Sequence, residues 1–241
     1  MSLPNNSPLE SRLSSNKKLI LCYVTDRRSL LVAAPKDSSE LLLEKMELAA
    51  AAGVDWIQLR EKDLSGKQSS VLTRAALRRV SNHSNQTTAH ARIIINDRLD
   101  VAIAERAGGI HLGENSMNAQ DAKRLLAASQ SVQTLPSDFL LGVSCHSLEA
   151  AQTAAAAGAV YIFFGPVFAT PSKAAYGPPQ GLARLAEVCS SVKIPVLAIG
   201  GITAENVPTC LSAGASGIAA IRLFQDSADL VGTVNALRQH V

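Results

Sequence analysis

A short segment of this chain places polar side chains at every second position. They are Gln58, Arg60 and Lys62. Because successive side chains of a strand point to opposite faces, all three would lie on one side, whereas Ile57 and Leu59 would face the other. Two cations and an amide at one strand end can hold a polyanion. Solvation at the surface is the alternative for Lys62, but it is a weaker explanation for Arg60, which extends an apolar strand.

A carboxylate follows the next apolar run. The run 92–96 ends in Asn96, and Asp97 comes directly after it. If the carboxyl ends of neighbouring strands meet at one barrel mouth, Asp97 lies close to Arg60 and Lys62. Mg²⁺ binds one or two carboxylates together with substrate phosphate oxygens. Asp97 is therefore expected either to hold a magnesium ion or to pair with Arg60.

Bare backbone near the end of the chain forms a second candidate anion site. Gly200 and Gly201 follow one apolar run, and another run ends at Ala220, Ile221 and Arg222. Main-chain N–H groups at strand ends and helix starts bind phosphate in many α/β enzymes. The glycines could equally serve only to allow a tight strand-to-helix turn, so both interpretations stay open.

Further polar side chains fall at predicted strand ends. A lone histidine is more often structural than catalytic, but His146 lies beside Ser144 just past a strand, so the two roles are weighed equally. A loop after the sixth strand is rich in hydroxyl groups and ends on Lys173, which would join Arg60 and Lys62 around one anion. The other expected substrate contacts are His111, Ser144, Thr170 and Ser172.

These candidates need a framework that gathers several strand ends. Apolar runs alternate with helical patterns along the chain, and the expected strands are 19–25, 56–60, 92–96, 110–112, 140–144, 161–165, 195–199 and 217–221. Helices are expected at 38–52, capped by Ser38 or Ser39, and at 147–157, capped by Ser147. Eight repeats predict a single-domain α/β fold, the (β/α)8 TIM barrel, with its chemistry at the carboxyl ends of the strands.

Four glycines support this count. Gly53, Gly108, Gly158 and Gly214 each follow an alanine and end a helix before a strand, at intervals of 55, 50 and 56 residues. Each interval spans two strand–helix units, so the glycines mark the entries to strands two, four, six and eight. A doubly wound open sheet would share the alternation, but it normally carries a Gly-rich loop after its first strand, and 25–28 reads Thr-Asp-Arg-Arg.

The composition fits one enzyme-sized domain. Of 241 residues, 47% are hydrophobic and only 4% aromatic, which suits helices packed around a parallel sheet. The formal net charge of +3 argues against a nucleic-acid partner, and no apolar run reaches the roughly 20 residues of a membrane helix. Four scattered cysteines fit free thiols in a cytoplasmic protein. The polar segment 1–16 predicts a flexible extension before a barrel over 17–241, and a homo-oligomer stays open.

Six short segments carry a resemblance to a known family. They read Tyr-Val-Thr-Asp at 23–26, Gln-Leu-Arg-Glu-Lys at 58–62, Ile-Asn-Asp at 95–97, His-Leu-Gly at 111–113, Gly-Pro-Val-Phe at 165–168 and Ala-Ile-Gly-Gly-Ile at 198–202. In this order, they resemble the thiamine-phosphate synthase superfamily. The resemblance implies a barrel enzyme that uses Mg²⁺ to join 4-amino-2-methyl-5-hydroxymethylpyrimidine diphosphate to a thiazole phosphate, with release of pyrophosphate. Its cations would stabilise the leaving group, and little acid–base chemistry is needed.

Two departures from the synthase pattern leave alternatives open. The synthases read Gln-Glu-Asp after His-x-Gly, with the Asp as a second magnesium ligand, whereas Ser116 occupies that place here. Ile221 and Arg222 replace the usual Val-Ser or Ile-Ser near the thiazole phosphate. Both changes resemble the TenI-type thiazole tautomerases, which aromatise a thiazole carboxylate phosphate and whose acid–base histidine matches His146. A non-catalytic phosphate-binding barrel is a third class, but the retained cations and Asp97 favour the synthase.

Overall fold

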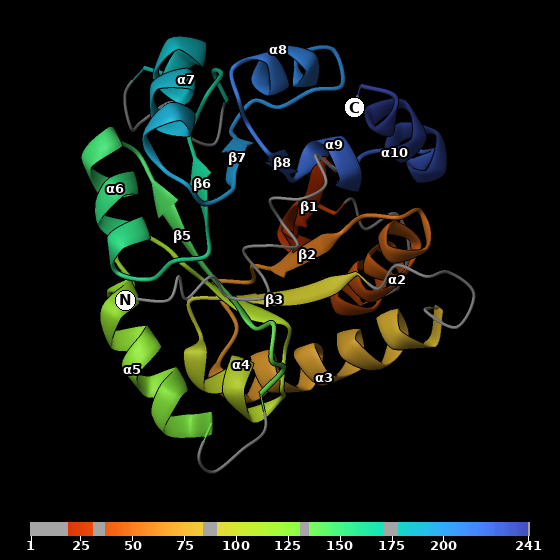
Figure 1. The fold of residues 1–241 in the computed structure, drawn as a ribbon. Coiled ribbons are helices and arrows are strands. Elements are labelled where there is room, and N and C mark those ends of the chain that lie inside the picture. Colours follow the sequence, from red (N-terminus) through yellow and green to blue (C-terminus); the bar gives the residue numbers. More distant parts are fainter. Residues whose placement is uncertain (1–18, 31–36, 84–90, 131–134, 171–177, 241) are drawn as a thin grey trace.

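A computed structural model describes residues 19–30, 37–83, 91–130, 135–170 and 178–240. Its eight parallel strands form a closed barrel in which each strand pairs with the next and β8 pairs with β1 (Figure 1). The strands are β1 Ile20–Val24, β2 Trp56–Leu59, β3 Arg92–Asn96, β4 Gly109–Leu112, β5 Leu140–Cys145, β6 Tyr161–Phe164, β7 Val196–Ile199 and β8 Gly217–Ala220. Each predicted strand is present with its ends shifted by no more than one residue, so the (β/α)8 barrel is confirmed.

Helices surround the barrel and connect the strands (Figure 1). They are α2 Ser38–Ala51, α3 Gly66–His83, α4 Leu99–Ala104, α5 Ala119–Gln130, α6 Leu148–Ala156, α7 Gly181–Ser191, α8 Val207–Ser212, α9 Arg222–Gln225 and α10 Leu230–Arg238, and the 3₁₀ turn η1 Arg27–Ser29 follows β1. The predicted cap of α6 is confirmed, since the Ser147 hydroxyl accepts the Ala150 N–H at 3.1 Å. The predicted cap of α2 is wrong. Asp37 caps it by accepting the Ser39 N–H at 3.1 Å, and a carboxylate also gains from the positive end of the helix dipole.

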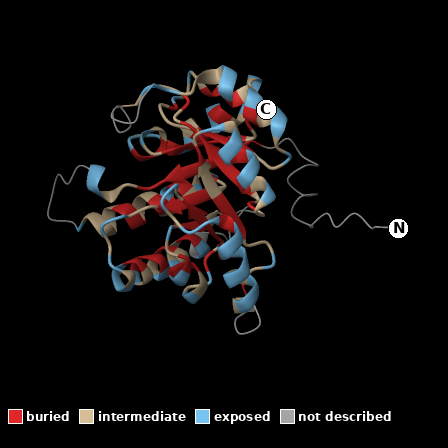
Figure 2. Ribbon diagram, turned by 90° about the vertical axis from the view of Figure 1, so that its left-hand side faces the viewer, coloured by how far each residue is buried: buried red, intermediate tan, exposed pale blue. Residues whose placement is uncertain are grey.

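Apolar side chains fill two separate regions. The larger lies between the strands and the helices and contains Ile57 and Leu59. The smaller fills the inside of the barrel and contains Trp56, Tyr161 and Phe163. Figure 2 shows the strands as almost entirely buried, whereas the helices expose their outer faces. The expected alternation along β2 is therefore present.

The helix-ending glycines are present at three of the four predicted sites. Gly53, Gly158 and Gly214 have left-handed backbone, with φ of 95°, 98° and 93°. Before β4 the prediction is wrong, because Arg106 takes the left-handed conformation there, with φ of 53°. Helix α4 ends at Ala104, so the chain reverses before Gly108. Gly108 instead allows close packing, since a Cβ there would lie 3.2 Å from the Ile93 carbonyl oxygen.

Two sequence expectations concern the chain as a whole. All four cysteines are free thiols, as expected. Within the described ranges, no helix is both long and apolar enough to span a membrane. The proposed extension over 1–16 lies outside the described residues and stays a prediction, as does the start of the barrel at residue 17.

Candidate active site

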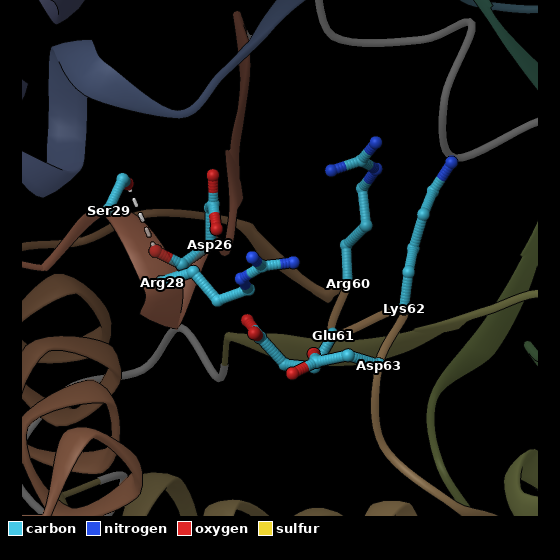
Figure 3. Close-up of a pocket in the computed structure, with 7 residues that line it drawn as sticks. All are labelled: Asp26, Arg28, Ser29, Arg60, Glu61, Lys62 and Asp63. Atoms are coloured by element: carbon cyan, nitrogen blue, oxygen red, sulfur yellow. Dashed lines mark hydrogen bonds between the residues drawn. The ribbon is translucent and has the colours of Figure 1, made fainter.

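Two cations project together from the end of β2. Figure 3 shows the side chains of Arg60 and Lys62 running in parallel, away from Glu61 and Asp63. They line an open pocket of about 600 Å³, whose other lining residues are Asp26, Arg28, Ser29, Glu61 and Asp63. The Arg60 guanidinium forms no hydrogen bond or ion pair with any described residue. A cation in this state can bind an anion without first breaking a contact within the protein.

Two carboxylates, Glu61 and Asp63, alternate with these cations along the chain. They bind other protein groups and hold the end of β2 in place. Glu61 accepts the Thr25 hydroxyl at 2.6 Å and the Arg27 N–H at 3.1 Å. The Arg27 guanidinium reaches Glu61 at 3.3 Å and Asp63 at 2.7 Å. Thr25 also accepts the backbone N–H of Arg60 at 2.9 Å. Glu61 and Asp63 thus offset the charge of Arg27, and they leave the Arg60 charge for a ligand.

A chain of hydrogen bonds fixes the carboxylate after β3. The buried Gln58 donates to the Asn96 side-chain oxygen at 2.9 Å, and Asn96 donates to Asp97 Oδ2 at 2.7 Å. The other oxygen, Oδ1, accepts the Gly113 N–H at 3.0 Å and the Ser116 hydroxyl. The alternative in which Asp97 pairs with Arg60 is absent among the described contacts. Three strand ends, those of β2, β3 and β4, therefore converge on Asp97.

These contacts keep Asp97 ionised. Burial raises the pKa of Asp97, but the bonds from Ser116, Gly113 and Asn96, with the nearby Lys62 charge, outweigh it and bring the pKa below its usual value. Within the described residues, no group of three or more His, Cys, Asp or Glu side chains could hold a metal ion. One ionised carboxylate beside a hydroxyl suits Mg²⁺ only if substrate oxygens and water complete the coordination.

His111 lies inside the barrel below the mouth and is 1% exposed. Its Nδ1 is 3.0 Å from the Tyr161 hydroxyl and its Nε2 is 2.9 Å from the Ser144 hydroxyl. Burial lowers the pKa of His111 to about 3, so the ring is neutral. With both ring nitrogens in hydrogen bonds, His111 can act on a ligand only through Ser144, which is half-buried at the carboxyl end of β5.

The ends of β5 and β6 place the second histidine. His146 is half-buried, and its Nδ1 contacts the carbonyl oxygen of Gly165, which precedes the cis peptide bond to Pro166. A carbonyl oxygen only accepts, so Nδ1 carries the proton and the lone pair of the neutral ring lies on Nε2. Thr170 is half-buried in the same loop. Ser172 and Lys173 lie outside the described residues, and their roles stay predictions.

The two glycines after β7 have a demonstrable packing reason. Gly200 and Gly201 have φ of 93° and 66°. A Cβ on Gly200 would lie 2.5 Å from Cα of Pro166, and one on Gly201 would lie 2.6 Å from the Ala169 carbonyl oxygen. The tight-turn interpretation is therefore supported, while phosphate binding remains compatible with it. In the other part of the same expected anion site, Ala220 ends β8 and is 7% exposed, Ile221 caps α9, and the exposed Arg222 begins that helix.

Two residues near the mouth have no sequence pattern that singles them out. Arg28 lies in a segment unlike a Gly-rich loop, yet it lines the pocket as a further cation. Gln225, 5% exposed, donates to the Asp26 carbonyl at 2.9 Å and to the Ser29 hydroxyl at 2.7 Å, and it accepts the Tyr23 hydroxyl at 2.8 Å. It therefore connects α9, which follows the last strand, to β1 and to the turn after β1. No local pattern indicated this role, because 202 residues separate Tyr23 and Gln225.

Comparison with known proteins identifies the family. A family model described as thiamine monophosphate synthase matches residues 29–224. The thiamine-phosphate synthase of Methanoculleus marisnigri is 44% identical over 195 residues, which are 80% of this chain and 85% of that protein. The thiamine-phosphate synthase of Chlorobium phaeobacteroides is 36% identical over 222 residues, or 92% and 96% of the two chains.

A solved structure agrees with these sequence matches. The thiamine phosphate pyrophosphorylase of Pyrococcus furiosus superposes with a TM-score of 0.73 at 30% identity, over 93% of this chain and 96% of that one. The resemblance found in the six segments is therefore confirmed over most of the chain. The protein belongs to the thiamine monophosphate synthase family.

Proposed function

We propose that this enzyme couples hydroxymethylpyrimidine diphosphate to thiazole phosphate, giving thiamine phosphate and pyrophosphate. Family membership supports the reaction class. The observation that carries the assignment is the arrangement of Arg60 and Lys62 in the open pocket, with an ionised Asp97 nearby. Small molecules in the cytoplasm are the proposed partners, and a homo-oligomer is compatible with them.

The reaction exchanges one bond for another at a single carbon. The C–O bond between the pyrimidine methylene and the diphosphate breaks, and its electron pair leaves with the pyrophosphate oxygen. The thiazole nitrogen then supplies the pair for the new C–N bond. Negative charge grows on the leaving group, so the cations Arg60, Lys62 and Lys173 lower the barrier most. Holding both substrates in line supplies much of the rest.

A magnesium ion fits the charged side of the mouth. Asp97 is the proposed protein ligand, with Ser116 beside it, and both lie in the bonded chain that begins at Gln58. Bound there, Mg²⁺ would neutralise charge on the departing pyrophosphate. Since Ser116 contributes no charge, the ion should bind weakly until the diphosphate brings its own oxygens.

The remaining predicted residues are proposed to bind the rest of the two substrates. Gly200 and Gly201, with the backbone of Ala220, Ile221 and Arg222, would hold the thiazole phosphate. The side chains proposed to contact the pyrimidine diphosphate are Gln58, Asn96, Ser144, Thr170 and Ser172. His111 supports Ser144 from within the barrel.

One observation favours a second activity. The Gly165 carbonyl fixes a proton of His146 on Nδ1, so the lone pair of the neutral, half-buried ring lies on Nε2. A base in this place would suit proton transfer in a thiazole tautomerase. Coupling needs no such base, so His146 separates the two activities.

A paired assay tests both activities. The protein is mixed with the pyrimidine diphosphate, thiazole phosphate and Mg²⁺, and thiamine phosphate is measured. A parallel reaction supplies thiazole carboxylate phosphate and follows aromatisation. Coupling that survives in His146→Ala and is lost on chelation of Mg²⁺ supports the synthase. Aromatisation that His146→Ala abolishes, with no coupling in the wild type, would overturn the assignment in favour of the tautomerase.

A further inference from the structure

A chain of three side chains runs from the centre of the barrel to its mouth. Tyr161 is completely buried, His111 is 1% exposed, and Ser144 is half-buried at the outer end. The two hydrogen bonds measure 3.0 Å from Tyr161 to His111 Nδ1 and 2.9 Å from His111 Nε2 to Ser144. The rings of Trp56 and Phe163 pack against this chain, with centroids 4.7 Å from Tyr161 and 4.1 Å from His111.

The positions of the protons in this chain follow from counting donors and acceptors. A neutral imidazole has one N–H and one lone pair. If Nδ1 carried the proton, it would donate to Tyr161, and the phenolic O–H would need a different acceptor. Among the described residues, only His111 forms a hydrogen bond with the Tyr161 hydroxyl. That hydroxyl is completely buried, so its unpaired proton would carry the full desolvation cost.

The other tautomer satisfies every group. Tyr161 donates to the Nδ1 lone pair, and the proton on Nε2 is donated to the Ser144 oxygen. Ser144 then accepts from within the barrel, and its own proton must point elsewhere. Both hydrogen-bond partners of the His111 ring are neutral hydroxyl groups and the residue is 1% exposed, so burial favours the neutral form of the ring.

We propose that Tyr161 and His111 are positioning residues that direct the Ser144 hydroxyl proton into the mouth as a donor for an anionic oxygen. A serine hydroxyl left alone rotates between donating and accepting, whereas this one is fixed as a donor towards the ligand. The functional part rests on the proposed binding of a diphosphate at the mouth. Glycine at position 142 leaves space for the Tyr161 ring, because a Cβ there would lie 2.0 Å from Cζ of Tyr161.

The tautomer can be measured without any substrate. The ¹⁵N shifts of His111 in the full-length protein should report a proton on Nε2 and a lone pair on Nδ1. Tyr161→Phe removes one oxygen and keeps the ring that packs on Trp56, and a population protonated on Nδ1 should then appear. Tyr23→Phe is the matched control, since it also removes a buried tyrosine hydroxyl, one bonded to Gln225 at 2.8 Å. It should leave the His111 shifts unchanged.

The functional part is tested with pyrophosphate and Mg²⁺ as the probe, by calorimetry. Tyr161→Phe should weaken pyrophosphate binding about 3-fold to 10-fold, the range expected for one misdirected hydrogen bond. In a Ser144→Ala background the same substitution should cause no further loss, because no hydroxyl remains to be directed. A role only in packing would weaken both backgrounds equally.

Several results would overturn the inference. They are a wild-type ring protonated mainly on Nδ1, unchanged pyrophosphate affinity in Tyr161→Phe, or equal losses in both serine backgrounds. If the wild-type protein binds no pyrophosphate at all, the proposed function fails together with the role of Ser144. The ¹⁵N shifts would then still decide whether Tyr161 sets the tautomer of His111.

Discussion

At the ends of β1 to β4 the barrel mouth presents charged side chains, whereas at the ends of β6 to β8 it presents main chain. In the first half, Arg60 and Lys62 line the pocket and Asp97 is held by three hydrogen bonds. In the second half, Gly200 and Gly201 lie so close to the preceding loop that neither has room for a Cβ. Both halves are proposed to bind an anion, but by different physical means.

Because of this difference, a substitution affects activity and stability to different extents in the two halves. A side chain such as Arg60 can be removed without disturbing the backbone, because its guanidinium has no partner among the described residues. The main chain around Gly201 cannot be changed in this way, since its packing and any phosphate binding depend on the same atoms. Substitution of Arg60 in the first half should therefore act on catalysis alone, whereas substitutions at the glycines of the second half should act on catalysis and stability together.

The largest expected effect is that of Arg60→Ala in the charged half. Loss of one charge-assisted contact to the leaving pyrophosphate should lower the coupling rate about 30-fold to 10³-fold. The melting temperature should hardly change. Arg124→Ala is the control, because Arg124 is exposed and its one ion pair among the described residues is with Asp121 on its own helix. If a well-folded Arg60→Ala protein couples at the wild-type rate, the leaving pyrophosphate does not bind in this half.

In the main-chain half, Gly201→Ala should lower both stability and binding. Alanine in the left-handed region costs about 1–2 kcal/mol, and overlap with the Ala169 carbonyl should add about 1–3 kcal/mol. The matched control is Gly181→Ala, where φ is 76° but, apart from the adjoining chain, no atom of the described residues lies within 4 Å of the added Cβ. Gly181→Ala should show only the first cost. Binding of thiazole phosphate, measured by calorimetry, should weaken about 10-fold in Gly201→Ala, and binding of pyrophosphate should not. Equal losses for both ligands would argue against two separate sites.

The sequence predicts the framework of both halves better than the connections between them. Eight buried strands show up as apolar runs, and alternation alone separates Arg60 from Glu61. The fold and family predictions are confirmed for these reasons. Contacts between distant segments leave no local pattern, so the bonds of Gln225 with Tyr23 and of Tyr161 with His111 could not be predicted.

The smaller errors have the same origin. Ser38 and Ser39 were good capping candidates by type, but the choice of Asp37 depends on where the chain enters the helix. Gly108 fits the glycine spacing, yet the reversal occurs at Arg106 because α4 ends early. Local composition states which residues suit a turn, and tertiary packing decides which of them is used.

A substitution with a more moderate expected effect tests the proposed magnesium site in the charged half. Ser116→Asp adds a second carboxylate beside Asp97, so Mg²⁺ should bind more tightly and coupling should rise at low metal concentration. Without metal, two close carboxylates repel, and the melting temperature should fall. Ser116→Asn supplies a neutral control of similar size. If Ser116→Asp leaves the Mg²⁺ dependence of coupling unchanged, Asp97 is not the metal ligand.

The smallest effect concerns Asp63, which helps to hold the charged half in place. Its hydrogen bonds from Arg27, at 2.7 and 2.8 Å, lower its pKa from 3.8 to about 2. The folded state therefore favours the ionised form. The resulting stability is fully present above the unfolded pKa near 3.8, and it is lost as the pH falls through about 2. Asp63→Asn should melt slightly below the wild type at pH 6, and the two proteins should converge between pH 4 and pH 2. The effect is small because Asp63 is exposed, so solvent screens its charge. Melting curves across this range measure it, and a gap that persists unchanged at pH 2 would show that the Arg27 contact does not depend on the charge of Asp63.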